Sequence, residues 1–532
     1  MHKISFHLRL AGALFLIVLA GFALRIYNVN YPSIGYHNMK ENEYLSQAQE
    51  MLKTGDYLTG RTYFYNGLED NPGISAASGV PLVAYQAIIS WKLFGENLWS
   101  VRLCGILFGL LSVLTMYFIS KRLFSDIYSP LSACFLTAIM PIAVFFSRNI
   151  QPESPALFFM LLGSFLYLRG NLISGALAFL VAWLYQPNFI IGAFPLLFCV
   201  HLKNTAKTKK DFLKAVIAAS APYLIILFSI LWLRHGPGPG IKLSAGFNPF
   251  YVFTSGYWKN YGAAIWRYIS VENFTPVFTL TAFLGIAFAL LRRKKPVERY
   301  IIGWAFAVIP YGMFYGESLR QACFYYMPFI PLVCVSSVYA VSRIAEAAGK
   351  IIKRDVAVGM IAIMIAISAP FIYNSLKGMH ATVFLGLDVA GESLKEFTNP
   401  DERIFLFTHS QGNAISRYAR RYVGWESDLE AFKEKERRLN IRYICIYPAE
   451  FAQTLKVDSP ELFGYIQNNY HAKEAGLTME PQRFFYIILE KGEGSDPKTF
   501  LQSFEGQARI KTIYKLFGKY IFFYTIRQST AG

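Results

Sequence analysis

The chain has 532 residues, with 52 lysines and arginines against 34 aspartates and glutamates, so its formal net charge is +18. Hydrophobic residues make up 54% of it and charged residues only 16%, whereas soluble globular proteins carry about 25% charged residues. A chain this rich in apolar and aromatic side chains is not disordered either. The composition predicts an α-helical polytopic membrane protein.

Apolar runs near the length of a membrane-spanning helix recur through residues 1–374. The run 80–93 is also apolar, but it is short and contains Lys92, so we expect it to lie in the membrane interface or to re-enter from one face. The remaining runs predict about 11 spans, at 8–26, 101–119, 127–146, 152–168, 171–185, 188–202, 213–233, 275–292, 299–316, 323–345 and 355–374.

Basic residues gather in short loops between these spans, for example at Lys121-Arg122 and at 292–295. Because cytoplasmic loops carry an excess of lysine and arginine, the N-terminus is predicted to be cytoplasmic. The long first loop, 27–100, and everything after 374 are then extracytoplasmic, at a plasma or inner membrane. Contact with anionic membrane lipids explains the positive charge better than a nucleic-acid partner does.

Residues 375–532 alternate between strand-like and helix-like segments, which is typical of a soluble α/β domain. We therefore expect two domains, a transmembrane domain at 1–374 that includes the first loop and an extracytoplasmic α/β domain at 375–532. The expected strands are 403–408, 442–447 and 484–489, and the expected helices lie near 389–398, 427–438 and 459–469.

The first loop contains His37, Lys40, Glu41 and Glu43 within seven residues. Two carboxylates beside a lysine and a histidine can supply a general base or hold a metal ion. An ordinary solvated helix start, where the helix dipole favours acids, explains the same residues.

A second polar group, Arg148 and Glu153, lies at the predicted outer ends of the third and fourth spans. A carboxylate at a membrane boundary is costly unless it is paired or used, although Glu153 after Pro152 also suits a helix start. On the predicted topology Glu153 shares one membrane face with Glu41 and Glu43. That convergence favours a functional role for all three acids.

Arginines at the predicted outer surface include Arg102, at the start of the second span, and Arg320, just before the tyrosine-rich run that contains Tyr325. Arginine can bind phosphate through two nitrogen atoms. It can equally anchor a span by extending its charged end to the headgroups.

These segments follow one another in a recognisable order. After the acidic first loop come Gly79-Val80-Pro81-Leu82, then Arg102-Leu103, Lys121-Arg122-Leu123-Phe124, Ser147-Arg148 and Pro152-Glu153. Over about its first 200 residues the chain resembles the GT-C glycosyltransferases of the dolichyl-phosphate-mannose–protein mannosyltransferase and aminoarabinose transferase group.

The resemblance implies a cell-envelope enzyme, for example of protein glycosylation. It would transfer a hexose or pentose from a polyprenyl-phosphate donor to a lipid, glycan or protein acceptor outside the cytoplasm. In the family, an acid in the first loop acts as the base or orients the acceptor, which implies Glu43 or Glu41. Glu43 is favoured, because the stretch from His37 resembles the family's His-x-x-Arg-Gln-x-Asp form with Glu43 in the aspartate position, whereas in the Asp-Glu form Lys40 would replace the aspartate. Glu153 stands where the family usually has a second aspartate.

The same resemblance implies that substrate and phosphate are bound by His37, Lys40, Arg102, Arg148, Arg320 and Tyr325. The sequence requires no cofactor, and a divalent cation held by Glu43 and Glu153 stays open. A transporter or flippase of a lipid-linked substrate is the rival function. It predicts ionisable groups near the middle of the membrane, whereas the acids here cluster at one outer boundary.

Overall fold

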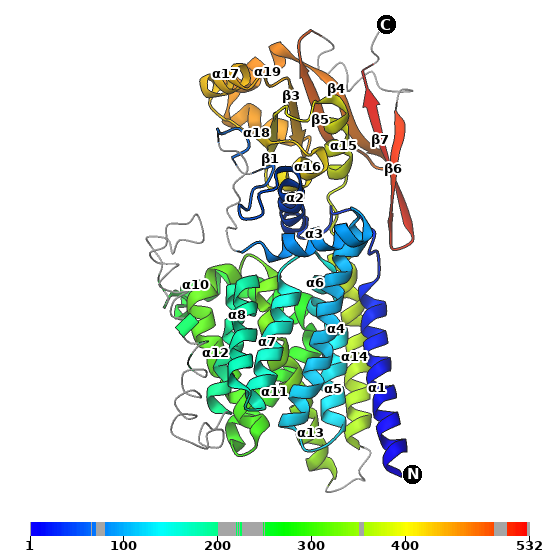
Figure 1. Ribbon diagram of the computed structural model, residues 1–532, viewed down its shortest axis with the longest axis vertical. Helices are drawn as coiled ribbons and strands as arrows, with labels where there is room; N and C mark the ends of the chain where they lie inside the picture. The colour runs from blue at the N-terminus through cyan, green and yellow to red at the C-terminus, as the bar shows by residue number, and fades with distance from the viewer. Residues whose placement is uncertain are drawn as a thin grey trace. The chain divides into compact units, whose positions relative to one another are not determined.

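The computed structural model describes residues 2–64, 66–70, 80–199, 250–349, 356–493 and 508–528, together with 220, 222, 224, 225 and 248. The chain forms two compact units (Figure 1). The first, which we call the helical unit, comprises Met1–Val29 and Trp99–Met379. The second, the mixed unit, comprises Asn30–Leu98 and His380–Gly532.

The helical unit is built almost entirely from helices. Its longer helices are α1 (His2–Arg25), α4 (Leu98–Leu123), α7 (Glu153–Leu168), α8 (Leu172–Tyr185), α11 (Thr275–Arg292), α12 (Pro296–Leu319), α13 (Ile330–Gly349) and α14 (Val356–Ala381). Its shorter ones are α5 (Tyr128–Ile139), α6 (Pro141–Arg148), η1 (Pro187–Phe198), η3 (Tyr251–Phe253), α10 (Ser255–Arg267), η4 (Tyr268–Asn273) and η5 (Cys323–Phe329).

Within the described ranges, five helices are long and apolar enough to cross a membrane: His7–Arg25, Leu98–Leu123, Thr275–Arg292, Cys323–Ala348 and Val358–Ala381. They confirm five predicted spans. The predicted spans 152–168, 171–185 and 188–202 form apolar helices of only 16, 14 and 12 residues. The predicted span 213–233 lies almost wholly outside the described residues, so the number of about 11 is not established.

The predicted span 127–146 is a broken one. Helices α5 and α6 meet at a bend of 53°. Met140, between them, has extended backbone angles, φ −59° and ψ 122°. Because a proline pushes the preceding residue out of the helical region, Pro141 explains why the helix is interrupted there.

A glycine allows two helices of this unit to approach closely. A Cβ atom on Gly285 of α11 would lie 2.0 Å from the carbonyl oxygen of Ser336 on α13, so the two backbones touch there. Small residues are the usual means by which membrane helices approach closely.

The mixed unit contains a seven-stranded sheet in the order β2-β1-β3-β5-β4-β7-β6. Strand β1 is parallel to β2 and β3, and the other pairs are antiparallel. The strands are β1 (Ile404–Thr408), β2 (Val423–Gly424), β3 (Tyr443–Tyr447), β4 (Tyr470–Met479), β5 (Gln482–Lys491), β6 (Arg509–Leu516) and β7 (Lys519–Arg527). The helices are α2 (Asn38–Thr54), α3 (Leu82–Phe94), α15 (Leu387–Phe397), α16 (Gly412–Ala419), α17 (Leu429–Arg438), α18 (Phe451–Asp458) and α19 (Pro460–Asn469).

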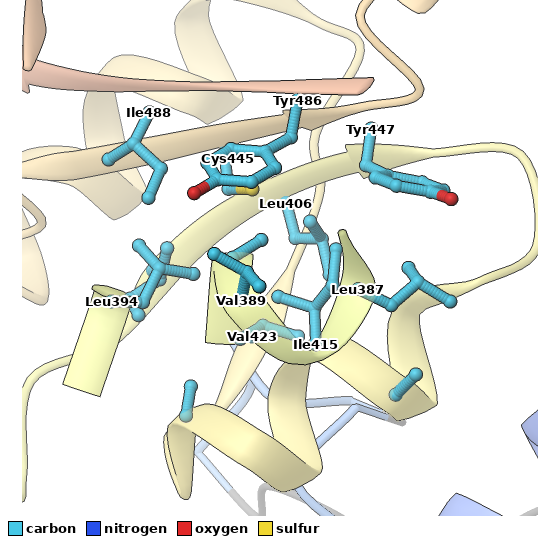
Figure 2. Packing of buried hydrophobic residues seen from close by; sticks show 14 of the residues in the cluster. Leu387, Val389, Leu394, Leu406, Ile415, Val423, Cys445, Tyr447, Tyr486 and Ile488 are labelled. Carbon is cyan, nitrogen blue, oxygen red and sulfur yellow. The ribbon is translucent and has the colours of Figure 1, made fainter. Parts of the chain in front are cut away.

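The three predicted strands and three predicted helices of the C-terminal region are confirmed as β1, β3, β5, α15, α17 and α19. Alternate residues of the strands face two separate apolar cores. Leu406 of β1 and Cys445 of β3 face the core under α15 and α16 (Figure 2), whereas their neighbours Phe405 and Ile444 face the core under α17 and α19. This period of two is what a sheet covered on both faces requires.

The first loop packs with the C-terminal region. The Val423 amide donates to the Tyr63 carbonyl (2.8 Å), and the Phe384 amide donates to the Ile34 carbonyl (2.8 Å). The contacts thus differ from the predicted division, which assigned 27–100 to the transmembrane domain and began the second domain at 375. Helix α14 continues past that boundary to Ala381.

We predict that Gly285→Ala destabilises the protein, by about 1–3 kcal/mol as is common for overpacking, because the new methyl group would collide with the α13 backbone. Gly359→Ala is the matched control, since a Cβ at exposed Gly359 in α14 meets nothing within 4 Å. Thermal unfolding in detergent should show a lower midpoint for Gly285→Ala only. Equal midpoints for the two variants would contradict the close α11–α13 contact.

Candidate active site

Helix α2 carries the acids of the first loop and buries its polar residues. Glu41 and Glu43 are each only 4% exposed, and Asn38, Asn42 and Ser46 are also buried. Burying a carboxylate costs free energy unless other groups bind it. A helix with its polar residues buried therefore indicates dedicated partners and not the solvated helix start that the sequence left open.

Glu41 has such a partner in Ser33, whose hydroxyl donates a short hydrogen bond to Oε2 of the Glu41 carboxylate. Ser33 is fully buried. Asn42 donates to the Ser33 carbonyl (2.7 Å), so the segment before α2 folds back onto the first turns of the helix. Glu41 is thereby held in one orientation.

The C-terminal half of α2 is fixed by the rest of the mixed unit. The Tyr422 hydroxyl donates to Glu50, and Gln49 donates to Glu96 (2.8 Å). Glu96 also forms an ion pair with Arg420 (2.6 Å). The acids of the first two turns therefore lie on a helix that is fixed at its far end.

His37 and Lys40 lie at the start of α2 and are half-buried. His37 adopts a left-handed backbone conformation with φ 59° as the helix begins. Burial, with a smaller contribution from the positive charge of Lys40, lowers the pKa of His37 to about 4. His37 is therefore neutral at pH 7, and Lys40 is the cation of this pair.

The helical unit brings together the second group of predicted residues. Nη1 of Arg148 donates to the carbonyls of Tyr27 and Asn28 (3.1 and 3.2 Å), and Nη1 of Arg102 donates to the next carbonyl, that of Val29 (2.8 Å). Two predicted phosphate ligands thus converge on three consecutive residues after α1. Both are largely buried.

Gly105 is where the segments that carry these residues meet. It lies one turn after Arg102, and a Cβ there would be 2.6 Å from the Ser147 carbonyl oxygen. Its own carbonyl accepts from Ser154 (2.8 Å), the residue after Glu153. Glu153 is the first residue of α7 and is fully buried. The close packing at Gly105 therefore gathers Arg102, Arg148 and Glu153 at the same end of the helical unit.

Arg25 belongs to the same group, and the sequence analysis missed it. This arginine is 1% exposed and donates to the Ser147 hydroxyl (2.7 Å) and to the Ala138 carbonyl (2.8 Å). It lay inside the predicted span 8–26. A cation at the outer end of an apolar span was the signal that could have found it.

Arg320 and Tyr325 have other partners. Arg320 forms an ion pair with Glu317 and lies over the ring of Tyr261, 4.6 Å from its centroid. The Tyr325 carbonyl accepts from the Tyr311 hydroxyl (2.5 Å), which in turn accepts from Asn188 (2.8 Å). Both predicted residues thus belong to a tyrosine-rich group near the end of α12.

The sequence left a metal site open. Among the described residues, no three or more His, Cys, Asp or Glu side chains are grouped so that they could hold a metal ion.

We predict that His37 makes the fold sensitive to acid. Since the pKa of His37 in the folded protein, about 4, is below the ordinary value of about 6.5, the fold favours the neutral ring. This stabilisation is complete above pH 6.5 and is lost as the pH falls towards 4. Thermal unfolding of the wild type and of His37→Gln should therefore diverge below pH 6.5, with the wild type losing more. Parallel curves from pH 7 to 4 would contradict the lowered pKa.

Part of the chain is similar to a known protein family. A model of the dolichyl-phosphate-mannose-protein mannosyltransferase family matches residues 75–232, which is less than half of the chain. The matched segment contains Arg102, Arg148 and Glu153, whereas Glu41 and Glu43 precede it.

Two proteins of Bacillus subtilis (strain 168), both provisionally named mannosyltransferases, are similar in sequence. YkcB is 29% identical over 218 residues, which are 39% of this chain and 29% of that protein. YycA is 28% identical over 211 residues, which are 38% and 29% of the two chains. The chain thus spans less than a third of the length of these relatives.

Among solved structures, the apo oligosaccharyltransferase of Archaeoglobus fulgidus matches with a TM-score of 0.52 and 14% identity, over 92% of this chain and 75% of that chain. At this identity the likeness shows the fold alone, which the chain shares with this oligosaccharyltransferase. The comparisons confirm the predicted resemblance. With five helices able to cross a membrane, the chain is an integral membrane protein.

Proposed function

We propose that the protein is a GT-C glycosyltransferase that transfers a hexose or pentose from a polyprenyl phosphate to a lipid, glycan or protein acceptor on the extracytoplasmic side. The observation that carries the proposal is the gathering of Arg102, Arg148 and Glu153 around Gly105, inside the segment that matches the mannosyltransferase family. The two Bacillus subtilis relatives support it through the activity in their names. The Archaeoglobus oligosaccharyltransferase supports it through the shared fold.

Arg102 and Arg148 are assigned to the lipid phosphate. A polyprenyl-phosphate sugar leaves its phosphate behind when the sugar moves, so the site must stabilise a growing negative charge. Each arginine donates through Nη1 to the backbone after α1, and a guanidinium can bind phosphate oxygens through two parallel N–H groups. The backbone bonds fix the arginines before substrate arrives. Support for a lipid-phosphate ligand also comes from the Archaeoglobus enzyme, which has been solved with dolichol-phosphate.

Glu43 is assigned as the general base, with Glu41 as the alternative. The acceptor hydroxyl or amide must lose a proton as it attacks the sugar, and a buried carboxylate can take it. Glu43 is preferred for proton transfer because it stands in the position of the aspartate in the form of the family motif that this chain resembles. The bond from Ser33 suits Glu41 to orienting the acceptor or the helix. Glu153 is assigned to orient the acceptor or bind a divalent cation.

Turnover of lipid-linked sugars tests these assignments. Purified protein is given a panel of radiolabelled polyprenyl-phosphate sugars, with a membrane extract as acceptor, and loss of label from the lipid is measured. We predict that the wild type uses at least one donor. Glu43→Gln should lower that rate by about 10²- to 10⁴-fold, the usual contribution of general base catalysis, and Glu153→Gln and Glu41→Gln should also lower it.

Glu69→Gln is the matched control. Glu69 is a partly exposed acid of the same first loop, and its ion pair with Lys435 (3.3 Å) lies on the surface, so its loss should leave turnover within about twofold, as expected for surface pairs. Full turnover in all three variants of the assigned acids would overturn the mechanism, and an inactive wild type with every donor would overturn the function.

Chemical labelling tests the predicted topology separately. Single cysteines at positions 53 and 317, in a cysteine-free background, should both react only with a membrane-impermeant maleimide added from the extracytoplasmic side. Lys53 lies in α2 with Glu43, Glu317 lies beside Arg320 at the predicted outer surface, and both side chains are exposed, whereas Glu43 and Glu153 are too buried for labelling. Reaction of the two positions from opposite sides would contradict the predicted topology.

A further inference from the structure

We propose that Tyr418 and Gln411, from the C-terminal part of the mixed unit, are positioning residues for the acidic helix α2. The inference rests on the proposed function, since it says how the acids of that site are held. Neither residue belongs to the segment of family resemblance, and both lie more than 350 residues from Glu41 in the sequence.

Ser33 is the residue through which Tyr418 acts. The Ser33 amide donates to the Tyr418 hydroxyl (3.0 Å), and the Ser33 carbonyl accepts from Asn42 (2.7 Å). With both backbone groups bound, the Ser33 hydroxyl is aimed at the Glu41 carboxylate, to which it donates. The place of that carboxylate therefore depends on Tyr418 through one intervening residue.

The neighbouring backbone is held in the same way. The Phe384 amide donates to the Ile34 carbonyl (2.8 Å), and Gly35 forms an isolated antiparallel bridge with Val383. The segment 33–35 is thus bound both by Tyr418 and by residues 383–384, all of which follow the predicted span 355–374. Of these contacts, the Tyr418 hydroxyl is the one that a single substitution can remove without changing the backbone.

Gln411 fixes the first residue of α2. Asn38 donates through Nδ2 to Oε1 of Gln411 (3.0 Å) and to the Gly35 carbonyl (2.9 Å). Gln411 stands in the turn between β1 and α16, immediately before α16 begins at Gly412. It is therefore attached to the central sheet.

Helix α16, which carries Tyr418 and begins directly after Gln411, is tightly packed. Ile415 and Ala419 of α16 are fully buried in the core under the sheet. A Cβ on Gly391 of α15 would lie 2.4 Å from Cβ of Tyr418, so α15 and α16 are in close contact at this residue. A packed helix can place a side chain to within the fraction of an ångström that catalysis needs.

Tyr418→Phe tests the proposal, because it removes the hydroxyl and keeps the ring. Misplacing a catalytic group by about 1 Å can cost about 10²-fold in rate, so we expect kcat to fall by about 10- to 100-fold while the KM for the donor changes by less than about threefold. Hydrogen–deuterium exchange of the peptides covering 30–44 should become faster. Gln411→Ala, a second variant, should act in the same direction.

Tyr465→Phe is the matched control. Its hydroxyl also donates to a glutamate of the mixed unit, Glu436 (2.9 Å). Among the described residues, neither α17 nor α19 contributes a hydrogen bond to segment 33–43. It should change neither kcat nor the exchange of residues 30–44.

The two measurements separate the possible failures. Unchanged exchange at 30–44 in both Tyr418→Phe and Gln411→Ala would overturn the positioning role, whatever the enzyme does. Faster exchange with unchanged kcat would also overturn it, because loosening of α2 would then have no effect on catalysis. A wild type that turns over no donor would overturn the proposed function and the catalytic half of this inference with it, while the exchange data would still decide whether Tyr418 and Gln411 hold the helix.

Discussion

The cost of burying charge is the constraint on which this structure depends. A charged side chain in a low-dielectric interior is tolerated only where other groups bind it. In the helical unit, buried Arg25, Arg102 and Arg148 satisfy this rule by donating to backbone carbonyls and to Ser147. The packing that brings these partners within reach also gathers the arginines at one end of the unit, so the groups able to bind an anion are in place before any substrate arrives.

The same constraint shapes the mixed unit. Glu41 is bound by Ser33, Glu50 by Tyr422, and Glu96 by Gln49 and Arg420. Two of these four partners, Tyr422 and Arg420, come from the C-terminal region, more than 320 residues along the chain from the acids they bind. The C-terminal region is therefore part of the framework of the acidic helix. This gives the C-terminal region a physical role at the proposed site.

Much of this architecture follows from local sequence patterns. The apolar runs and the period of two in 404–408 and 443–447 predict helices and strands well. Strands β2, β4, β6 and β7 were missed, although β4 and β6 each form a hairpin with the strand that follows. The packing of 30–98 with the C-terminal region was missed because it depends on partners distant in sequence. For the proposed site, residue type and order predict Glu41, Glu43, Arg102, Arg148 and Glu153, and their roles stay predictions. Ser33 and Tyr418 were not predicted, since a serine and a tyrosine carry no signal until the fold brings them together.

The central claim is that the lipid phosphate binds at the arginines around Gly105. A cryo-electron microscopy structure of the full-length protein with bound undecaprenyl phosphate tests this most directly. The account predicts the phosphate within hydrogen-bonding distance of Arg102 or Arg148, on the side of the helical unit where α7 begins with Glu153. A phosphate bound instead among Arg122, Lys295 and Arg343, which line a cavity of about 390 Å³ in the helical unit, would contradict it.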